Sequence, residues 1–404
     1  MQKRLCYLVI LVIFSALNLT AQNITKWRGL NSLGDYQETG LLKQWSAAGP
    51  DRIWYYEGLG EGHSSPAIAN NLIYLSGMID QTGYVIALDF DGKLKWKAPY
   101  GVEFTESYPG SRSTPVIADD LLYIYSGNGL LTCMDANNGT VKWKKDAFKD
   151  FDGKNITWGV TETVVVDGDV VYLTPGGKSN NLVALNRING NLLWSSPGLG
   201  EKSAYCTPLV VELPSRKILV THTADHIIGL DSRDGKLLWS YPHTNRYQVH
   251  PNTPVYNNGE LFCFSGYGQG SVKLTLSDDG SSVKKAWIND KLDSRIGGIV
   301  LLDGFLYGSG DTNRQWRCVN WNTGEETYAS TEIAKGVVIS ADGMLYCYSE
   351  RGELALVEAT PKGFNIKGLT KVDLGTAQHW AHPVINQGRL FLRHGDVLIA
   401  YKIK

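Results

Sequence analysis

The stretch ALDFDGKLKW (87–96) returns three more times along the chain, and these copies decide the fold. They are CMDANNGTVKW (133–143), ALNRINGNLLW (184–194) and GLDSRDGKLLW (229–239). Each copy has a small residue, an apolar residue, Asp or Asn, a turn that contains Gly, and a final apolar stretch that ends in Trp. Asn-Gly and Asp-Gly favour tight turns between antiparallel strands, so each copy predicts a β-hairpin. A catalytic motif is needed only once, whereas a structural unit repeats.

A second hairpin pattern precedes each copy, as in PAIANNLIYLSG (66–77) and PVIADDLLYIYSG (115–127). Eight such patterns occur along the chain. Pro66 and Pro115, which open equivalent strands, are 49 residues apart, and Pro208 and Pro254 are 46 apart. A period in the forties with four short strands per unit is typical of a β-propeller. The sequence therefore predicts an all-β, eight-bladed propeller with four antiparallel strands per blade.

The two ends of the chain are expected to share one blade. The eighth hairpin runs through GDVLIAYKIK (395–404) to the C-terminus and leaves no outer strand of its own. The early stretch DRIWYYEG (51–58) has the outer-strand pattern without a preceding set of three strands. We therefore predict that residues 53–57 close the last blade, which also removes exposed sheet edges. TKVDL (370–374) is the weakest predicted outer strand, in the seventh blade.

The repeated tryptophans predict contacts between blades. We expect Trp96, Trp143, Trp194, Trp239 and Trp287 each to lay an indole between adjacent blades, burying roughly 150–250 Å², or about 4–6 kcal/mol before opposing terms. The small residues that begin the repeats would leave space for these rings: Ala87, Cys133, Ala184, Gly229 and Cys318.

Residues 1–21 have the pattern of a secretory signal, and residues 22–404 are expected to form a single propeller domain. Lys3 and Arg4 precede an apolar stretch that is too short to span a bilayer. Cys6 lies within this stretch rather than after it, so no lipobox is present and we expect export without a lipid anchor. No later stretch has the length of a transmembrane span. These features predict a periplasmic or secreted protein.

Composition excludes several classes of protein. The 39 basic and 40 acidic residues nearly balance, which argues against a nucleic-acid-binding surface. The five cysteines that follow the signal are dispersed and include no CxxC pair, so they indicate neither a zinc site nor a disulfide scaffold. We expect these cysteines to be core residues and the protein to be a monomer.

The AxDxxxGxxxW pattern at this spacing resembles the tryptophan-docking motif of the pyrroloquinoline-quinone-like (PQQ-like) eight-bladed propellers. That family includes quinone-dependent alcohol dehydrogenases, the outer-membrane assembly scaffold and members without a settled activity. The resemblance implies that an enzyme of this kind would stack the quinone on a Trp and bind Ca²⁺ through a Glu. Trp158 and Glu162 are the candidates for these roles. The adjacent cysteine pair that is usual in these enzymes is absent.

Any binding site is expected at the mouth of the central channel, in the residues just before each innermost strand. This set is rich in His, Arg and aromatic side chains: His63, Arg112, Trp158, Tyr205, His250, Arg295, Lys335, Trp380 and His382. Arg can grip a carboxylate or sulfate, Trp can stack on a sugar, and His or Tyr can transfer a proton.

We do not predict a metal site. His63, His250 and His382 belong to blades one, five and eight, too far apart for one ion. His222 and His226 have i,i+4 spacing, but they lie in a strand and a turn, where the helical zinc geometry does not apply.

The sequence favours an exported binding or scaffold module for an envelope protein or for an anionic or sugar ligand. Two alternatives remain open: a carbohydrate-active lyase or glycosidase that uses His, Tyr and Arg at the mouth, and a PQQ-dependent dehydrogenase. Fold alone does not decide between them.

Overall fold

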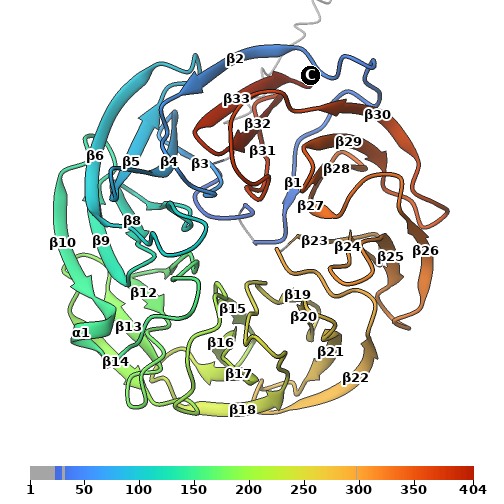
Figure 1. Ribbon diagram of the computed structural model, residues 1–404. Helices are drawn as coiled ribbons and strands as arrows, with labels where there is room; N and C mark the ends of the chain where they lie inside the picture. The colour runs from blue at the N-terminus through green and yellow to red at the C-terminus, as the bar shows by residue number, and fades with distance from the viewer. Residues whose placement is uncertain (1–22, 30–31, 297) are drawn as a thin grey trace, which may run out of the picture.

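Eight sheets, each built on four antiparallel strands, surround a central axis as the blades of a propeller in the computed structural model (Figure 1); one of them has a fifth strand, β1 (Asp35–Tyr36), at its inner edge. The structure describes residues 23–29, 32–296 and 298–404. The expected architecture is confirmed. Within the described residues the one α-helix is the single turn α1 (Ala147–Asp150) after the outer strand of blade 2. The predicted secretory signal lies outside the described residues.

The strands of each blade follow one another along the chain from the innermost to the outermost, with the last blade as the exception. Blade 1 comprises β3 (Ala67–Ala69), β4 (Leu72–Ile79), β5 (Thr82–Leu88) and β6 (Leu94–Val102), and blade 2 comprises β7 (Val116–Ala118), β8 (Leu121–Tyr125), β9 (Leu130–Asp135) and β10 (Val141–Asp146). Blade 3 comprises β11 (Val165–Asp167), β12 (Val170–Leu173), β13 (Leu182–Asn186) and β14 (Leu192–Ser196), and blade 4 comprises β15 (Leu209–Glu212), β16 (Lys217–His222), β17 (His226–Asp231) and β18 (Leu237–Pro242). Blade 5 comprises β19 (Val255–Asn257), β20 (Glu260–Ser265), β21 (Gly270–Leu276) and β22 (Val283–Asn289), and blade 6 comprises β23 (Ile299–Leu302), β24 (Phe305–Ser309), β25 (Trp316–Asn320) and β26 (Glu326–Ser330). Blade 7 comprises β27 (Gly336–Ala341), β28 (Met344–Ser349), β29 (Glu353–Glu358) and β30 (Ile366–Lys371). Blade 8 comprises β31 (Val384–Asn386), β32 (Arg389–His394) and β33 (Val397–Lys402), with β2 (Arg52–Glu57) as its outer strand.

The last blade joins the two ends of the chain. β2 pairs antiparallel with β33, and Tyr55 lies opposite Ile399 in the register. The predicted closure by residues 53–57 is therefore confirmed. Because β2 supplies the outer strand of blade 8, the ring closes through backbone hydrogen bonds rather than through side-chain contacts alone.

The tryptophans of the outer strands lie in the seams between blades, as predicted. Four of the five predicted ones lie opposite a small residue of their own blade, as Trp194 lies opposite Ala184, whereas Trp287 lies opposite Lys273. The indole N–H of Trp194 then donates to the Ser232 carbonyl of the next blade at 3.0 Å. Equivalent indole-to-carbonyl bonds of 2.8–3.1 Å are made by Trp54, Trp143, Trp239 and Trp287.

A glycine in the turn of the neighbouring blade makes room for most of these rings. Gly235 has φ +73°, and a Cβ there would lie 2.5 Å from the ring of Trp194. Gly190 stands in the same relation to Trp143, at 2.8 Å. The glycine of the repeat therefore has two functions: it adopts the left-handed turn conformation and it allows an indole to contact the backbone.

The seam between blades 7 and 8 is filled by the N-terminal segment. β1 (Asp35–Tyr36) pairs in parallel with β27, the innermost strand of blade 7. Trp45 then packs over Gly368 and beside Tyr346 of blade 7, with ring centroids 5.9 Å apart. Figure 1 shows β1 running between β27 and β31. The early part of the chain therefore supplies the aromatic ring that the seventh blade lacks.

The outer strand of blade 7 lies earlier than the sequence predicted. TKVDL (370–374) was the expected strand, whereas β30 spans Ile366–Lys371. Gly368 within this strand lies against Trp45, where a Cβ would come 2.6 Å from the Trp45 Cβ. The five described cysteines are free and buried, as expected of core residues. Among the described residues, no helix has the length and apolar character needed to cross a bilayer.

Replacing Gly235 with Ala tests the seam contact. The new methyl group meets the ring of Trp194, so we expect Gly235→Ala to lower the free energy of unfolding by about 1–3 kcal/mol more than Gly259→Ala does. Gly259 is the matched control, because it has φ +82° in another hairpin turn and a Cβ added there would meet no atom within 4 Å. Urea unfolding monitored by tryptophan fluorescence gives both values. Equal losses would contradict the packing role.

Candidate functional site

The nine residues predicted to face the channel mouth all lie in segments that lead from the outer strand of one blade to the innermost strand of the next. These segments emerge at the same end of the propeller. Seven of the nine line a single cavity of about 200 Å³, which we call the mouth cavity: His63, Arg112, Trp158, Tyr205, Arg295, Trp380 and His382.

The other two predicted residues lie outside this cavity. His250 is fully buried beside His222 and His243. Lys335 hydrogen-bonds to the Asp311 carboxylate and lies 3.7 Å from a carboxylate oxygen of Glu350. Lys335 is therefore held in an ion-pair network.

Aromatic rings form much of the wall of the mouth cavity. Trp380 contacts Tyr108 and His63, with ring centroids 4.9 and 5.0 Å away. On the other side Trp158 lies 6.3 Å from Tyr205. Tyr108 and Tyr267 also line the cavity, although the sequence analysis did not single them out. Tyr108 could have been found by its place in a segment between blades; Tyr267 lies in the turn between β20 and β21, where no sequence signal marks it.

Both arginines of the mouth cavity are already bound within the protein. Arg112 donates to the carbonyl oxygens of Ser107 and Tyr108, each at 2.7 Å. Arg295 donates to Asp311 at 3.2 Å and to Glu350 at 2.7 Å. Their charges remain, but most of their hydrogen-bonding capacity is used, which disfavours a bidentate grip on an anion.

The N-terminal segment blocks the channel below the mouth cavity. Trp27 lines the cavity and packs edge-on against His382, with centroids 5.1 Å apart. The buried Arg28 donates to the Ile299 and Val338 carbonyls at 2.8 and 2.9 Å and lies 2.9 Å from His382 Nδ1. Burial lowers the pKa of Arg28 to about 10, which still leaves it charged at neutral pH. The sequence analysis did not anticipate this plug.

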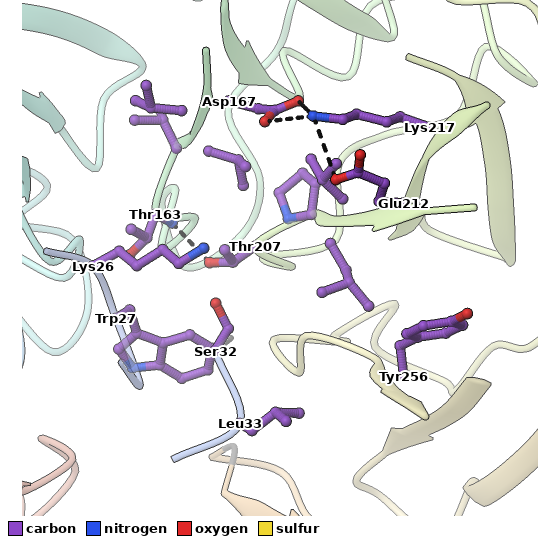
Figure 2. Close-up of a pocket in the computed structure, with 16 residues that line it drawn as sticks. Lys26, Trp27, Ser32, Leu33, Thr163, Asp167, Thr207, Glu212, Lys217 and Tyr256 are labelled. Carbon is purple, nitrogen blue, oxygen red and sulfur yellow. Dashed lines mark hydrogen bonds and ion pairs between the residues drawn. The ribbon is translucent and has the colours of Figure 1, made fainter. Parts of the chain in front are cut away.

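A second cavity, of about 410 Å³, lies on the far side of the plug and is lined in part by Trp27, Thr163 and Thr207, which line the mouth cavity as well. Figure 2 shows Lys217 between two carboxylates, 3.1 Å from Asp167 and 3.8 Å from Glu212. The two cavities thus have different chemistry: the far one is bordered by strand residues and an ion-pair cluster, the mouth by aromatic rings.

His63 is the polar group of the mouth cavity with the most unused bonding capacity. Neither of its ring nitrogens has a hydrogen-bond partner among the residues that the structure describes. Burial, and then the positive charges of Arg393 and Arg112, lower the pKa of His63 to about 3, so the ring is neutral at pH 7. The same charges make the cavity electropositive. None of its described lining residues is an Asp or a Glu.

The residues present do not fit a Ca²⁺-bound quinone. Glu162, the candidate calcium ligand, is buried and does not line the mouth cavity with Trp158. Both of its carboxylate oxygens accept from the Thr174 amide, at 3.1 and 3.2 Å. Burial raises the pKa of Glu162 well above its ordinary value, the opposite of what a cation ligand requires.

Comparison with known proteins places this architecture among propellers of two kinds. Residues 81–330 match the family described as outer membrane protein assembly factor BamB. The BamB of Kangiella koreensis is 26% identical over 53% of this chain and 52% of its own length, so the chain spans about half the length of the curated relative. The quinoprotein alcohol dehydrogenase PedH of Pseudomonas putida is 24% identical over 57% of this chain and 37% of its own length.

Solved structures agree in fold. The BamB of Moraxella catarrhalis superposes with a TM-score of 0.64 at 15% identity, over 88% of this chain and 98% of that chain. A europium-containing methanol dehydrogenase superposes with a TM-score of 0.68 at 12% identity, over 93% of this chain and 90% of that chain. At these sequence identities the superpositions establish the propeller fold and give no information about activity.

The neutral state of His63 predicts a pH dependence of stability. The pKa of His63 is about 3 in the folded protein and about 6.5 when unfolded, so unfolding takes up a proton between these values and stability falls as the pH drops below about 6.5. His63→Gln removes this proton. We expect the slope of unfolding free energy against pH between about pH 5 and 6 to decrease by up to about 1.4 kcal/mol per unit. Urea titrations of both proteins at three pH values measure it; parallel slopes would show that His63 is charged in the folded state.

Proposed function

Because the chain belongs to the family described as outer membrane protein assembly factor BamB, we propose that it is a binding and scaffold module of the cell envelope. In this proposal a protein partner docks at the mouth cavity. The predicted signal in residues 1–21 and the names of the BamB relatives support an envelope location, in the periplasm or outside the cell.

The closed, aromatic shape of the mouth cavity is the observation that carries the proposal. Trp27 and Arg28 block the channel, so a bound molecule enters and leaves by the same opening. The surrounding rings include Trp158, Trp380 and the half-exposed Tyr108. Large rigid rings around a small pocket suit the insertion of one apolar or aromatic side chain of a partner, which is how anchor residues act in protein interfaces.

The charge around the cavity favours a partner that has an acidic residue next to the inserted side chain. Arg28 and Arg393 are buried, and each is bonded to carbonyl or side-chain acceptors without a carboxylate among the described residues. Positive charges that no carboxylate hydrogen-bonds lower the free energy of a nearby anion. The two ring nitrogens of His63, which have no partner among the described residues, can hydrogen-bond to the same segment. A segment that presents an aromatic and an acidic residue matches this combination.

The enzymatic alternatives receive less support. A lyase of the uronate type needs an Arg that is free to neutralise a carboxylate, whereas Arg112 and Arg295 are bound to carbonyl and carboxylate oxygens. A quinone-dependent dehydrogenase needs a carboxylate ligand for calcium at the stacking residue, and Glu162 is turned into the blade. Titration with the quinone and Ca²⁺ is therefore expected to leave the absorption spectrum of the quinone unchanged.

Site-specific photocrosslinking in the intact envelope tests the proposal. A photoreactive residue at Tyr108, 47% exposed at the mouth, is expected to form a covalent adduct with a defined envelope protein. The same residue at Ile288, 65% exposed on an outer strand, is expected to form none. Trp380→Ala should weaken the Tyr108 adduct by about 10-fold or more, as loss of an anchor contact does.

The contradicting outcomes are distinct. Equal adducts from Tyr108 and Ile288 would mean that the mouth is not the docking site. An adduct from Tyr108 that consists of saccharide would replace the protein partner with a sugar ligand. An unchanged far-ultraviolet circular dichroism spectrum of the Trp380→Ala protein would show that the loss of the adduct reflects loss of binding rather than loss of folding.

A further inference from the structure

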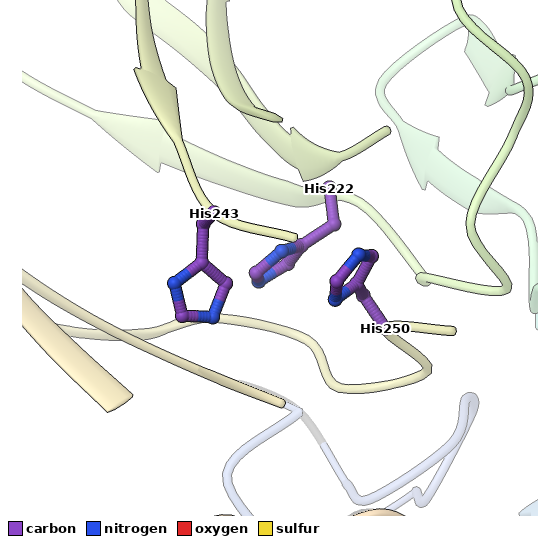
Figure 3. A group of neighbouring side chains, drawn as sticks. All are labelled: His222, His243 and His250. Carbon is purple, nitrogen blue, oxygen red and sulfur yellow. The ribbon is translucent and has the colours of Figure 1, made fainter. Parts of the chain in front are cut away.

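Three buried histidines meet in blade 4, away from the mouth cavity. His222 is the last residue of β16, His243 directly follows β18, and His250 lies in the segment that leads to blade 5. One ring nitrogen from each lies within 4.8 Å of the other two. Figure 3 shows the three rings grouped together, with those of His222 and His250 face to face. None is more than 4% exposed.

Three of the six ring nitrogens of this group are without a partner among the described residues. Both ring nitrogens of His222 and Nε2 of His243 are buried and have no hydrogen-bond partner among the described residues. Buried polar atoms of a folded protein are nearly always paired, because leaving one unpaired costs its hydration. Three unpaired nitrogens in one place therefore indicate that something else binds them.

His250 is held in the orientation that a metal ligand needs. Its Nε2 lies 3.1 Å from the Ala224 carbonyl, so Nε2 carries the proton and Nδ1 keeps its lone pair. Nδ1 lies 2.8 Å from the Ser265 hydroxyl, which also lies 3.1 Å from the Val249 carbonyl. The hydroxyl can donate to Val249 instead, and the Ser265 side chain would have to move aside when an ion binds Nδ1. Metal-bound imidazoles are commonly oriented in this way, by a carbonyl on the second nitrogen.

His243 connects the group to solvent. Its Nδ1 lies 3.4 Å from the side-chain amide of Gln269, which lines an open cavity together with Asn245 and Gln248. Rotation of the Gln269 amide would present its oxygen to Nδ1–H and leave Nε2 as the lone-pair nitrogen. An ion can therefore approach past Gln269, and the fourth coordination position can be taken by a small molecule from the same side.

From this geometry we infer that His222, His243 and His250 form a three-imidazole binding site for a divalent transition-metal ion, with Zn²⁺ as the best match. Imidazole nitrogen suits Zn²⁺ and its first-row neighbours, whereas Ca²⁺ and Mg²⁺ require oxygen ligands. Three histidines with an open fourth position are an established zinc arrangement. The inference does not depend on the proposed envelope function.

Only a small adjustment is needed to close the site. Zn–N bonds of about 2.0–2.1 Å in a tetrahedral site place the ligand nitrogens about 3.4 Å apart. The present nitrogens lie within 4.8 Å of one another, so rotation of the rings about their Cβ–Cγ bonds must bring them closer. The rings of His222 and His250 are nearly parallel, at 16° with centroids 5.2 Å apart, so at least one of them must turn before both lone pairs point at the same ion.

Metal titration of the purified full-length protein tests the site. After treatment with a chelator and dialysis, we expect one equivalent of Zn²⁺ to bind with a dissociation constant below about 1 µM. Co²⁺ in the same site should give the visible absorption of a four-coordinate ion, and Zn²⁺ should raise the unfolding temperature. His243→Ala should weaken Zn²⁺ binding by at least about 100-fold, since even a hydrogen-bond partner of a ligand contributes about 10–100-fold.

His226→Gln is the matched control. His226 belongs to the same blade, but its Nδ1 faces the Glu201 carboxylate at 2.6 Å rather than the cluster, so Zn²⁺ binding should be unchanged. If His243→Ala fails to fold, His222→Gln and the Co²⁺ spectrum of the unsubstituted protein replace it. Absence of stoichiometric Zn²⁺ binding, or equal binding by the cluster variants, would overturn the inference.

Discussion

The ring depends on one repeated contact, in which an indole from the outer strand of one blade lies on the glycine turn of the next. The contact combines apolar burial with a hydrogen bond between blades, such as that from Trp194 to the Ser232 carbonyl at 3.0 Å. A neutral N–H bond of this kind adds directionality to a nonspecific apolar contact. Since the position of each blade is fixed by its neighbour, the segments between blades all reach the same end of the channel.

The N-terminal segment supplies contacts that the repeats do not provide. Blade 7 has no outer tryptophan, and Trp45 of the early chain packs over Gly368 in its place. The same segment supplies β2 to close the ring and Arg28 to block the channel. Eight blades of this size would leave an open axial channel; here the chain fills it with its own residues.

Charge and aromatic character at that mouth then follow from the same arrangement. Arg28 and Arg393 can remain buried as cations because backbone carbonyls converge on them where the blades meet. Burial, and then the charges of Arg393 and Arg112, keep His63 neutral. The arginines that the sequence predicted as ligand-binding groups are hydrogen-bonded within the protein, and tryptophan and tyrosine rings form much of the cavity wall.

The sequence by itself determined the eight blades, the closure by residues 53–57 and the indole seams, because turn glycines, strand alternation and tryptophan spacing are local and repeat. It also identified the segments that form the mouth. Only the tertiary structure decided which side chains meet there: that Arg28 fills the channel, that Glu162 turns into its blade, and that His250 joins His222 and His243 instead of the mouth. Those outcomes depend on contacts between residues that are distant or irregular in sequence, and no local period encodes them.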